Sequence, residues 1–302
     1  MSDRACQTIL SVRDYDLAAT LSSGQAFRWE HRDGAWDGVV DRRWVRLRPT
    51  SGEILAQTST PVEDWRWLTN YLRTDENLEP VLASFPDDEP LRAAVNACRG
   101  LRLLRQDPWE CLASFILSST KQIVQIRQIV ALLCRRFGEP VPVPGGNGEV
   151  FSFPIPERIA TCTEAELREC KMGFRAPYLR GTAQSIAKNE MDLNCIRTMP
   201  VDAARAELMR LPGVGRKIAD CVLLFAYGFQ EAFPVDVWVM KALRQLYFPR
   251  RRVSQKRLEK FTTTYFGPNA GYAQQYLFHY MRTQAKPKSN PRPDTRDPRP
   301  ET

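Results

Sequence analysis

Residues 211–225, LPGVGRKIADCVLLF, combine two glycines, a lysine and a long apolar run. They come directly after VDAARAELMR (201–210), which has a helical pattern. Together the two segments predict a helix, a tight turn and a second helix from Arg216 to Phe229. Gly213 and Gly215 allow positive φ values and the close approach of a ligand. The turn exposes N–H groups suited to an anion such as a DNA phosphate, and its carbonyls could hold a cation. An ordinary helix–helix turn is the alternative.

Lys217 lies in the first turn of the second predicted helix, where the helix dipole favours acidic residues. The dipole and partial burial both favour the neutral, nucleophilic form of its amine. Cys221 follows four residues later and shares the same helix face. The alternative for Lys217 is a surface lysine that contacts a phosphate.

Asp236 precedes the next predicted helix, in FPVDVWVMKALRQLY, and is expected to be its N-cap. An aspartate between apolar neighbours at a helix mouth can also direct its carboxylate at a developing cation. Across one hydrophobic helix, Lys217 and Asp236 therefore form a candidate nucleophile–carboxylate pair.

Composition narrows the class of protein. The chain has 302 residues, 43% of them hydrophobic, and a formal net charge of +8, which suggests either a polyanionic partner or a solvated basic surface. Its eight cysteines form no C-x-x-C pair, which argues against a zinc ribbon or an iron–sulfur cluster, and two histidines exclude a multi-histidine metal centre. The cysteines are expected to be reduced core thiols of an intracellular protein. Neither a signal peptide nor a membrane-spanning run is predicted.

The pattern along the chain predicts an α+β fold. Residues 1 to about 60 alternate as short strands, with a hairpin signal at HRDGAW, and the chain becomes helical from Val62. Thr163 and Glu166 match a capping box. We expect a small antiparallel twisted sheet in a β-rich domain with flanking helices (1–105), packed on a helical domain that contains the hairpin 211–215 (106–282). The low-complexity segment 283–302 is predicted to be disordered.

Taken in order, the motifs resemble the helix–hairpin–helix (HhH-GPD) DNA glycosylase superfamily, and within it the 8-oxoguanine DNA glycosylase/AP lyase branch. The hairpin and FPVDVW carry the superfamily likeness. The branch likeness is carried by SSGQAFRW (22–29), PWECLASFILSS (108–119), GFRAPYL (173–179) and AGYAQQYLF (270–278). The resemblance covers nearly everything up to Arg282 and implies a TBP-like N-terminal sheet domain.

The resemblance implies excision of 8-oxoguanine from duplex DNA after base flipping. Lys217 would attack C1′ and displace the base, and the resulting Schiff base would allow β-elimination and a nick. Asp236 would stabilise oxocarbenium character and assist proton transfers.

The resemblance also implies a base pocket. The carbonyl of Gly24 would accept the N7–H that guanine lacks, a contact worth about 1–3 kcal/mol. Cys221 and Phe278 would sandwich the base, and Gln274 would read its Watson–Crick edge. The alternatives are a turn glycine, a core cysteine and a phenylalanine of a plain amphipathic helix.

Further positions are matched to DNA and cation binding. The DNA-binding residues implied are Gly213, Gly215, Ile218, Arg175 (to the estranged cytosine) and Thr120. The carbonyls implied to hold an alkali-type cation at the hairpin belong to Met209, Leu211 and Val214.

Four positions depart from the family pattern, in which Asn, Arg, His and Asp are usual. They are Thr120, Gln125, Trp238 and Met281. Because Thr120 and Gln125 replace residues that fill the vacated gap and read the opposite base, we predict weaker selectivity for cytosine opposite the lesion.

Two other functions remain as alternatives: a glycosylase for another damaged purine, and a non-enzymatic helix–hairpin–helix DNA-binding module. Lys217, Gly24 and Gln274 argue against the first, and the second leaves Lys217 and Asp236 without a joint role. We expect a monomer that acts on duplex DNA containing 8-oxoguanine, with no cofactor and no membrane partner. Its location is expected to be with the DNA, in the cytoplasm or nucleoid of a bacterium or the nucleus of a eukaryote.

Overall fold

The computed structural model describes residues 6–146, 149–249 and 253–284. Its main sheet is antiparallel, with the strand order β1-β5-β4-β3-β2. The strands are β1 (Gln7–Ser11), β2 (Glu30–Arg32), β3 (Ala35–Val40), β4 (Arg43–Thr50) and β5 (Glu53–Thr58). The hairpin expected at HRDGAW is confirmed, because β2 and β3 pair across Asp33 and Gly34, which both have positive φ, as turns matching the strand twist require.

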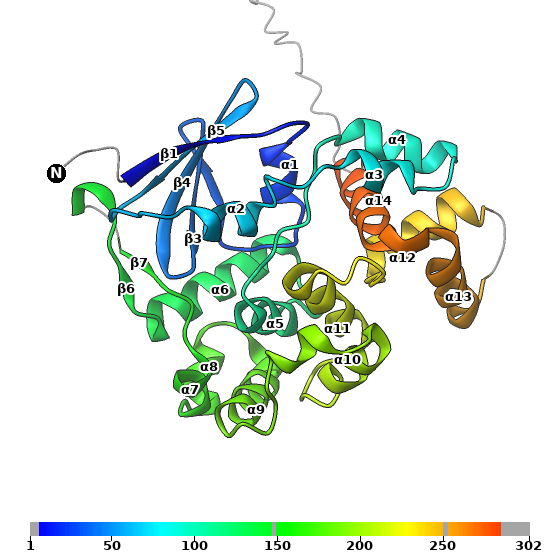
Figure 1. Cartoon of the computed structure of the whole chain (residues 1–302). Coiled ribbons are helices and arrows are strands. Elements are labelled where there is room, and N and C mark those ends of the chain that lie inside the picture. Colours follow the sequence, from blue (N-terminus) through cyan, green and yellow to red (C-terminus); the bar gives the residue numbers. More distant parts are fainter. Residues whose placement is uncertain (1–5, 147–148, 250–252, 285–302) are drawn as a thin grey trace, which may run out of the picture.

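Helices dominate the remainder of the chain, and the predicted α+β class is confirmed (Figure 1). They are α1 (Leu17–Ser22), α2 (Arg66–Leu72), α3 (Glu79–Ala83), α4 (Glu89–Ala97), α5 (Pro108–Leu117), α6 (Ile123–Phe137), α7 (Pro156–Ala160), α8 (Glu164–Glu169), α9 (Ala176–Ala187), α10 (Val201–Leu208), α11 (Arg216–Val222), α12 (Val237–Ala242), α13 (Gln255–Tyr265) and α14 (Ala270–Gln284). A short strand pair, β6 (Pro140–Val141) and β7 (Val150–Phe151), lies in the Pro/Gly-rich loop.

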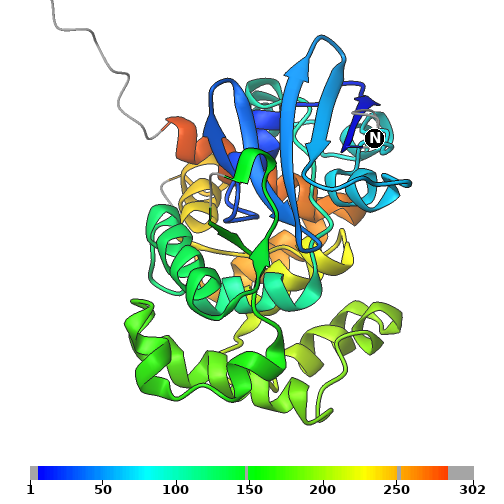
Figure 2. The same cartoon turned by 90° about the vertical axis from the view of Figure 1, so that its left-hand side faces the viewer.

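The arrangement brings distant parts of the chain together. In both views, the sheet and helices α7–α10 lie at opposite ends of the molecule (Figures 1 and 2). Helix α14 packs beside α4, so the last described helix returns to the N-terminal half. The division at residues 105 and 106 stays a prediction. The predicted tail lies outside the described residues, apart from Thr283 and Gln284, which end α14.

Local sequence explains where these helices begin and end. Asp107 caps α5 by accepting from the N–H of Glu110 at 2.8 Å, and Pro108 occupies the first turn, where its missing N–H costs nothing. The predicted capping box at Thr163 is confirmed. The helix expected over 216–229 is instead α11 followed by a π-helical turn, Leu223–Tyr227, and ends at Gly228 with φ of 77°.

Candidate active site

The helix–turn–helix predicted from LPGVGRK is present as α10, the turn 209–215 and α11. Gly213 has a φ of 76°, and a Cβ there would lie 2.7 Å from the side chain of Tyr178 on α9. Both the backbone conformation and the close contact therefore require glycine. Thr182 Oγ1 on α9 donates to the carbonyl of Pro212 at 3.1 Å, so α9 holds the turn in place. Gly213 and Gly215 remain exposed to solvent.

A buried ion pair joins the two helices of the hairpin. Arg205 Nε on α10 lies 2.6 Å from Asp220 Oδ1 on α11, and both residues are buried. Because a buried charge is tolerated only with a well-placed partner, this pair restricts how α11 is oriented. The orientation of α11 in turn determines where Lys217 and Cys221 point.

Lys217 is half-buried and faces the C-terminal end of α5. Its Nζ donates to Ser118 Oγ at 3.2 Å and lies 5.2 Å from the centroid of the Phe115 ring. The amine is therefore held at one position by a neutral acceptor and an aromatic face, and its other hydrogen-bonding directions remain available to a substrate.

Asp236 caps α12 as predicted, since its Oδ1 accepts from the N–H groups of Trp238 at 2.9 Å and Val239 at 2.8 Å. Burial raises the pKa of this carboxyl above its ordinary value, against the opposing effects of those hydrogen bonds and of the charge of Lys217. The two predicted catalytic residues therefore sense one another's charge, and the structure brings them into one site.

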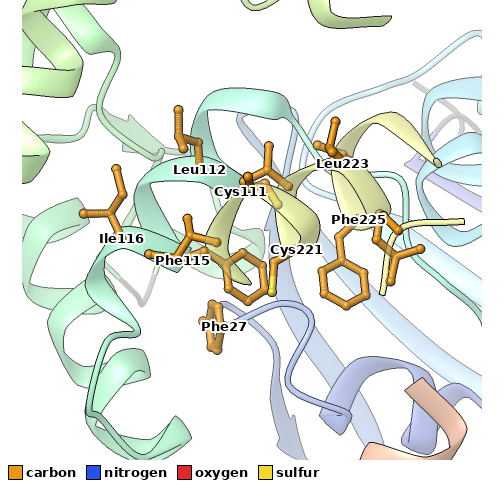
Figure 3. Packing of buried hydrophobic residues seen from close by; sticks show 14 of the residues in the cluster. Phe27, Cys111, Leu112, Phe115, Ile116, Cys221, Leu223 and Phe225 are labelled. Atoms are coloured by element: carbon orange, nitrogen blue, oxygen red, sulfur yellow. The ribbon is translucent and has the colours of Figure 1, made fainter. Parts of the chain in front are cut away.

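Cys221 lies in the aromatic part of the core (Figure 3). The ring centroids of Phe115 and Phe225 are 5.6 Å apart, those of Phe27 and Phe115 are 5.5 Å apart, and Cys221 packs among these side chains. Burial raises the pKa of the Cys221 thiol to about 12, although the charge of Lys217 opposes this. Because the thiol stays neutral, the lysine is the better candidate nucleophile of the two. The core role left open for Cys221 is therefore present, and the charges of Lys217 and Asp236 act on its thiol.

Gly24 lies in a loop between α1 and β2 and has a φ of 82°. A Cβ there would lie 2.7 Å from Ile123 Cδ1 and 3.3 Å from Phe278 Cε1, so a side chain at this position would fill the space beside the phenylalanine ring. This packing favours the close-approach role over a simple turn glycine.

Buried hydrogen bonds fix the loop that carries Gly24. Gln25 Nε2 donates to the carbonyl of Arg102 at 2.7 Å, and its Oε1 accepts from the N–H of Leu104 at 2.8 Å. From α14, Gln275 Nε2 donates to the carbonyl of Ser23 at 3.1 Å. At about 1 kcal/mol for each buried hydrogen bond, these contacts hold the loop rigidly between the sheet and the helical body.

Gln274 and Phe278 lie one turn apart on α14, and both are buried. Gln274 is 3% exposed, and its Oε1 has no hydrogen-bond partner among the described residues. A buried amide oxygen without a partner is costly. It is therefore well placed to accept hydrogen bonds from a bound ligand.

Arg175 is turned inward and contacts Thr120, which is itself exposed. Arg175 is only 2% exposed, donates to the carbonyl of Ser119, and its Nη2 lies 2.7 Å from Thr120 Oγ1. The predicted contact of Arg175 with an estranged cytosine therefore requires release of its guanidinium from this loop. Its neighbour Phe174 is 56% exposed and forms an edge-to-face pair with Tyr178.

The other residues matched to the hairpin differ in accessibility. Ile218 is buried and its N–H donates to the carbonyl of Gly215 at 3.0 Å, and the carbonyl of Leu211 accepts from the N–H of Val214 at 3.1 Å. The side chain of Met209 is exposed. The cation site at these carbonyls stays a prediction. Within residues 6–146, 149–249 and 253–284, no group of three or more His, Cys, Asp or Glu side chains could hold a metal ion.

The remaining departures have local roles. Gln125 Oε1 accepts from the N–H of Gln122 at 3.1 Å and so completes a capping box at the start of α6. Trp238 is half-buried, with Lys241 Nζ 5.4 Å from its ring centroid, and Met281 is buried.

Sequence reasoning missed three residues that the fold places at the site. Ser118 accepts a hydrogen bond from Lys217. Phe174 is exposed beside Arg175. Arg282 contacts the ring of Phe278. The first two lie inside motifs that were recognised, so neighbours of the matched positions were the available signal. Arg282 carries no such signal, because its contacts to the Gly24 loop depend on how α14 packs.

A separate cavity of about 110 Å³ lies beside Lys217, between the hairpin helices and α13. Its lining includes Arg205, Arg216, Thr262 and Thr263. Because Gly24, Gln274 and Phe278 do not line it, it lies apart from the residues predicted to bind the base.

The helical body with its glycine hairpin and capping aspartate places the protein in the class of HhH-GPD base excision DNA repair proteins. The family model described as the HhH-GPD superfamily base excision DNA repair protein matches residues 113–268, and the one described as the 8-oxoguanine DNA glycosylase N-terminal domain matches residues 8–112. The chain belongs to the 8-oxoguanine DNA glycosylase family of this superfamily.

Similar proteins span nearly the whole chain. A probable N-glycosylase/DNA lyase of Methanothermobacter thermautotrophicus is 31% identical over 90% of this chain and 95% of its own. The N-glycosylase/DNA lyase OGG1 of Arabidopsis thaliana is 30% identical over 89% of this chain and 78% of its own. The Clostridium acetobutylicum 8-oxoguanine glycosylase/lyase, solved with DNA containing cytosine opposite 8-oxoguanine, is 30% identical with a TM-score of 0.85, covering 93% of this chain and 99% of that one.

Proposed function

We infer that the chain is a bifunctional base excision repair enzyme that excises 8-oxoguanine from duplex DNA and nicks the resulting abasic site. The observation that carries this inference is the shared environment of Lys217 and Asp236. The amine is held by Ser118 Oγ at 3.2 Å, and its charge acts on the partly buried carboxyl of Asp236. A non-enzymatic DNA-binding module would need neither the partly buried amine nor the desolvated carboxylate.

The chemistry we propose uses this pair in sequence. The neutral amine of Lys217 forms a bond to C1′ of the flipped nucleotide while the C1′–N9 bond breaks. The electron pair of the C1′–N9 bond leaves with the base, and the base takes up a proton. Asp236 stabilises positive charge on the sugar during this step. The lysine–sugar adduct opens to a Schiff base, and loss of a proton from C2′ then expels the 3′ phosphate by β-elimination.

Base recognition follows from the residues around Gly24. We propose that the Gly24 carbonyl accepts N7–H, that the unpartnered Oε1 of Gln274 accepts N–H groups of the Watson–Crick edge, and that Phe278 stacks on the base. We propose that Cys221, as a neutral thiol, lies against the opposite face of the base. Guanine lacks the N7–H, so it would present an acceptor to the Gly24 carbonyl.

We propose that the hairpin and the exposed ring of Phe174 contact the duplex. Gly213 and Gly215 leave the N-terminus of α11 open to a backbone phosphate, and the net charge of +8 favours duplex DNA. The exposed ring of Phe174 is a candidate wedge between base steps. We propose that the protein acts as a monomer and uses only its own side chains, without a cofactor. None of the helices in the described part of the chain is both long and apolar enough to cross a bilayer.

Borohydride trapping tests this proposal. The wild type should become covalently linked to a duplex containing 8-oxoguanine, whereas Lys217→Gln should remain unlinked although folded. Lys188→Gln is the matched control, because Lys188 is exposed beyond the end of α9 and its ion pair among the described residues is with Glu190 at 4.0 Å. Absence of a covalent product with the wild type would exclude the lysine mechanism and favour a binding module.

The same assay on four duplexes tests the base opposite the lesion. Thr120 and Gln125 stand where the family usually has Asn and Arg, so we propose that excision rates vary little among cytosine, thymine, guanine and adenine. A strong preference for cytosine would contradict this and would point to Arg175 as a sufficient reader.

A further inference from the structure

Arg282 lies where the residues predicted to hold the lesion base meet. Its Nη2 donates to the carbonyl of Ser22 at 3.0 Å, and its guanidinium carbon lies 5.4 Å from the ring centroid of Phe278. A Cβ at Gly24 would lie 3.2 Å from Arg282 Nη1. The guanidinium is therefore fixed beside both the carbonyl loop and the stacking ring.

The Nη1 group of Arg282 is buried and has no hydrogen-bond partner in the part of the chain that the structure describes. No ion pair is formed by this arginine within the same residues. Burial and the like charge of Arg127 lower the pKa of its guanidinium, and the opposite charge of Asp236 offsets part of that effect. Leaving a charged donor buried without an acceptor is costly. The arrangement is therefore incomplete until a ligand supplies an acceptor oxygen.

The chemistry of the lesion identifies that acceptor. The imidazole side of 8-oxoguanine presents N7–H flanked by two carbonyl oxygens, O6 and O8, whereas guanine has C8–H in place of O8. A donor placed next to an acceptor matches this edge. Arg282 Nη1 lies 3.2 Å from where a Cβ of Gly24 would be, so it is a donor beside the residue whose carbonyl is the proposed acceptor. A backbone phosphate is a poorer match, because the buried Nη1 lies against Gly24 and Phe278 and not at the exposed hairpin.

We propose that Arg282 is a second specificity residue for the lesion, which donates Nη1–H to O8 of the flipped 8-oxoguanine while Gly24 accepts N7–H. The proposal rests on the proposed function, and it adds a contact that discriminates against guanine through a different atom. The hydrogen bond from Nη2 to Ser22 holds the guanidinium in place before the base arrives, so little reorganisation is needed on binding.

Binding by a catalytically inactive protein tests the proposal. In the Lys217→Gln background, affinity is measured for two duplexes that differ only in 8-oxoguanine or guanine opposite cytosine. Adding Arg282→Met should weaken binding of the 8-oxoguanine duplex by about ten- to a hundredfold, the loss expected for a hydrogen bond from a charged donor, and leave the guanine duplex nearly unchanged. Arg105→Met is the matched control, because Arg105 is also partly buried but donates to the carbonyl of Tyr227.

Three other outcomes would contradict either the role proposed for Arg282 or the proposed function. Equal weakening of both duplexes, with a salt dependence shallower by about one unit, would assign Arg282 to a phosphate and refute base reading. Unchanged affinity for both duplexes would leave it a structural role only. If the Lys217→Gln protein binds the 8-oxoguanine and guanine duplexes with equal affinity, the proposed function itself is refuted, whatever Arg282 does.

Arg282→Lys keeps the test valid if the methionine variant does not fold. Lysine retains the charge but not the rigid fork that holds Nη1 beside Gly24. Base reading therefore predicts a loss confined to the 8-oxoguanine duplex, whereas a phosphate contact predicts nearly full retention of affinity for both.

Discussion

Thr120 is held in a backbone conformation that a β-branched residue rarely adopts. Its φ is 55°, in the left-handed region, and it lies in the loop between α5 and α6. Such a conformation costs about 1–3 kcal/mol for a residue other than glycine, and asparagine tolerates it best among the others. We predict that Thr120→Asn raises the free energy of unfolding by about 1 kcal/mol.

The magnitude follows from two separable contributions. The first is backbone strain, which Asn and Gly both relieve. The second is the hydrogen bond from Arg175 Nη2 to Thr120 Oγ1, 2.7 Å long, which the side-chain oxygen of Asn can replace but Gly and Ala cannot. Because Arg175 Nη2 still donates to the carbonyl of Ser119, removing the Thr120 acceptor costs about 1 kcal/mol, the net value of one hydrogen bond. The expected order of stability is therefore Asn above the wild type, Gly near the wild type, and Ala below it.

Urea unfolding at constant temperature measures this order. At a slope of about 3 kcal/mol/M, a gain of about 1 kcal/mol shifts the midpoint upward by about 0.3 M with the slope unchanged. A Thr120→Asn variant less stable than the wild type would refute the strain argument. A Thr120→Ala variant as stable as the wild type would show that the Arg175 contact contributes nothing to folding.

Three further predictions concern charge and exposure. Burial raises the folded-state pKa of Asp236, so the ionised carboxylate opposes folding at neutral pH. Asp236→Asn keeps the helix cap, so its melting temperature at pH 7 should be higher than that of the wild type, although excision is lost. The difference in melting temperature should vanish below the ordinary aspartate pKa of about 3.9. Arg205→Met should destabilise by up to about 3–5 kcal/mol in urea unfolding, because it removes the hydrogen-bonded partner of buried Asp220 and leaves the carboxylate with Arg216 at 3.8 Å; the double variant with Asp220→Leu should recover most of that loss. Phe174→Ala should leave thermal stability nearly unchanged but weaken binding of the lesion duplex by about five- to a hundredfold in anisotropy titrations, and an unchanged affinity would exclude a stacking role.

The fold was predictable where local chemistry determines it. The Asp33–Gly34 hairpin, the Thr163 capping box and the Asp236 cap follow from a few adjacent residues, and all three are present. The π-helical turn at 223–227 was not predictable, because it depends on how α11 packs against α5 rather than on local sequence.

The candidate site was predictable in its residues but not in its contacts. Lys217 and Asp236 were identified from helix-start chemistry together with the ordered motifs. By contrast, the turn of Arg175 into the Thr120 loop, and the position of Arg282 at Gly24, each join segments far apart in the chain. Such contacts are decided by packing of whole helices, which periodicity does not encode.

Burial acts differently on three neighbouring ionisable groups at this site. It raises the pKa of Asp236, keeps Cys221 a neutral thiol and lowers the pKa of Arg282. One desolvated environment therefore disfavours charge on the carboxyl, the thiol and the guanidinium alike, and it also strengthens every remaining charge–charge interaction. A flipped nucleotide that brings developing positive charge on its sugar and acceptor oxygens on its base would offset the cost of both Asp236 and Arg282. We propose that the free-energy cost of desolvating Asp236 and Arg282 is offset only when the matching substrate fills the site, which would link recognition of the lesion to stabilisation of the transition state.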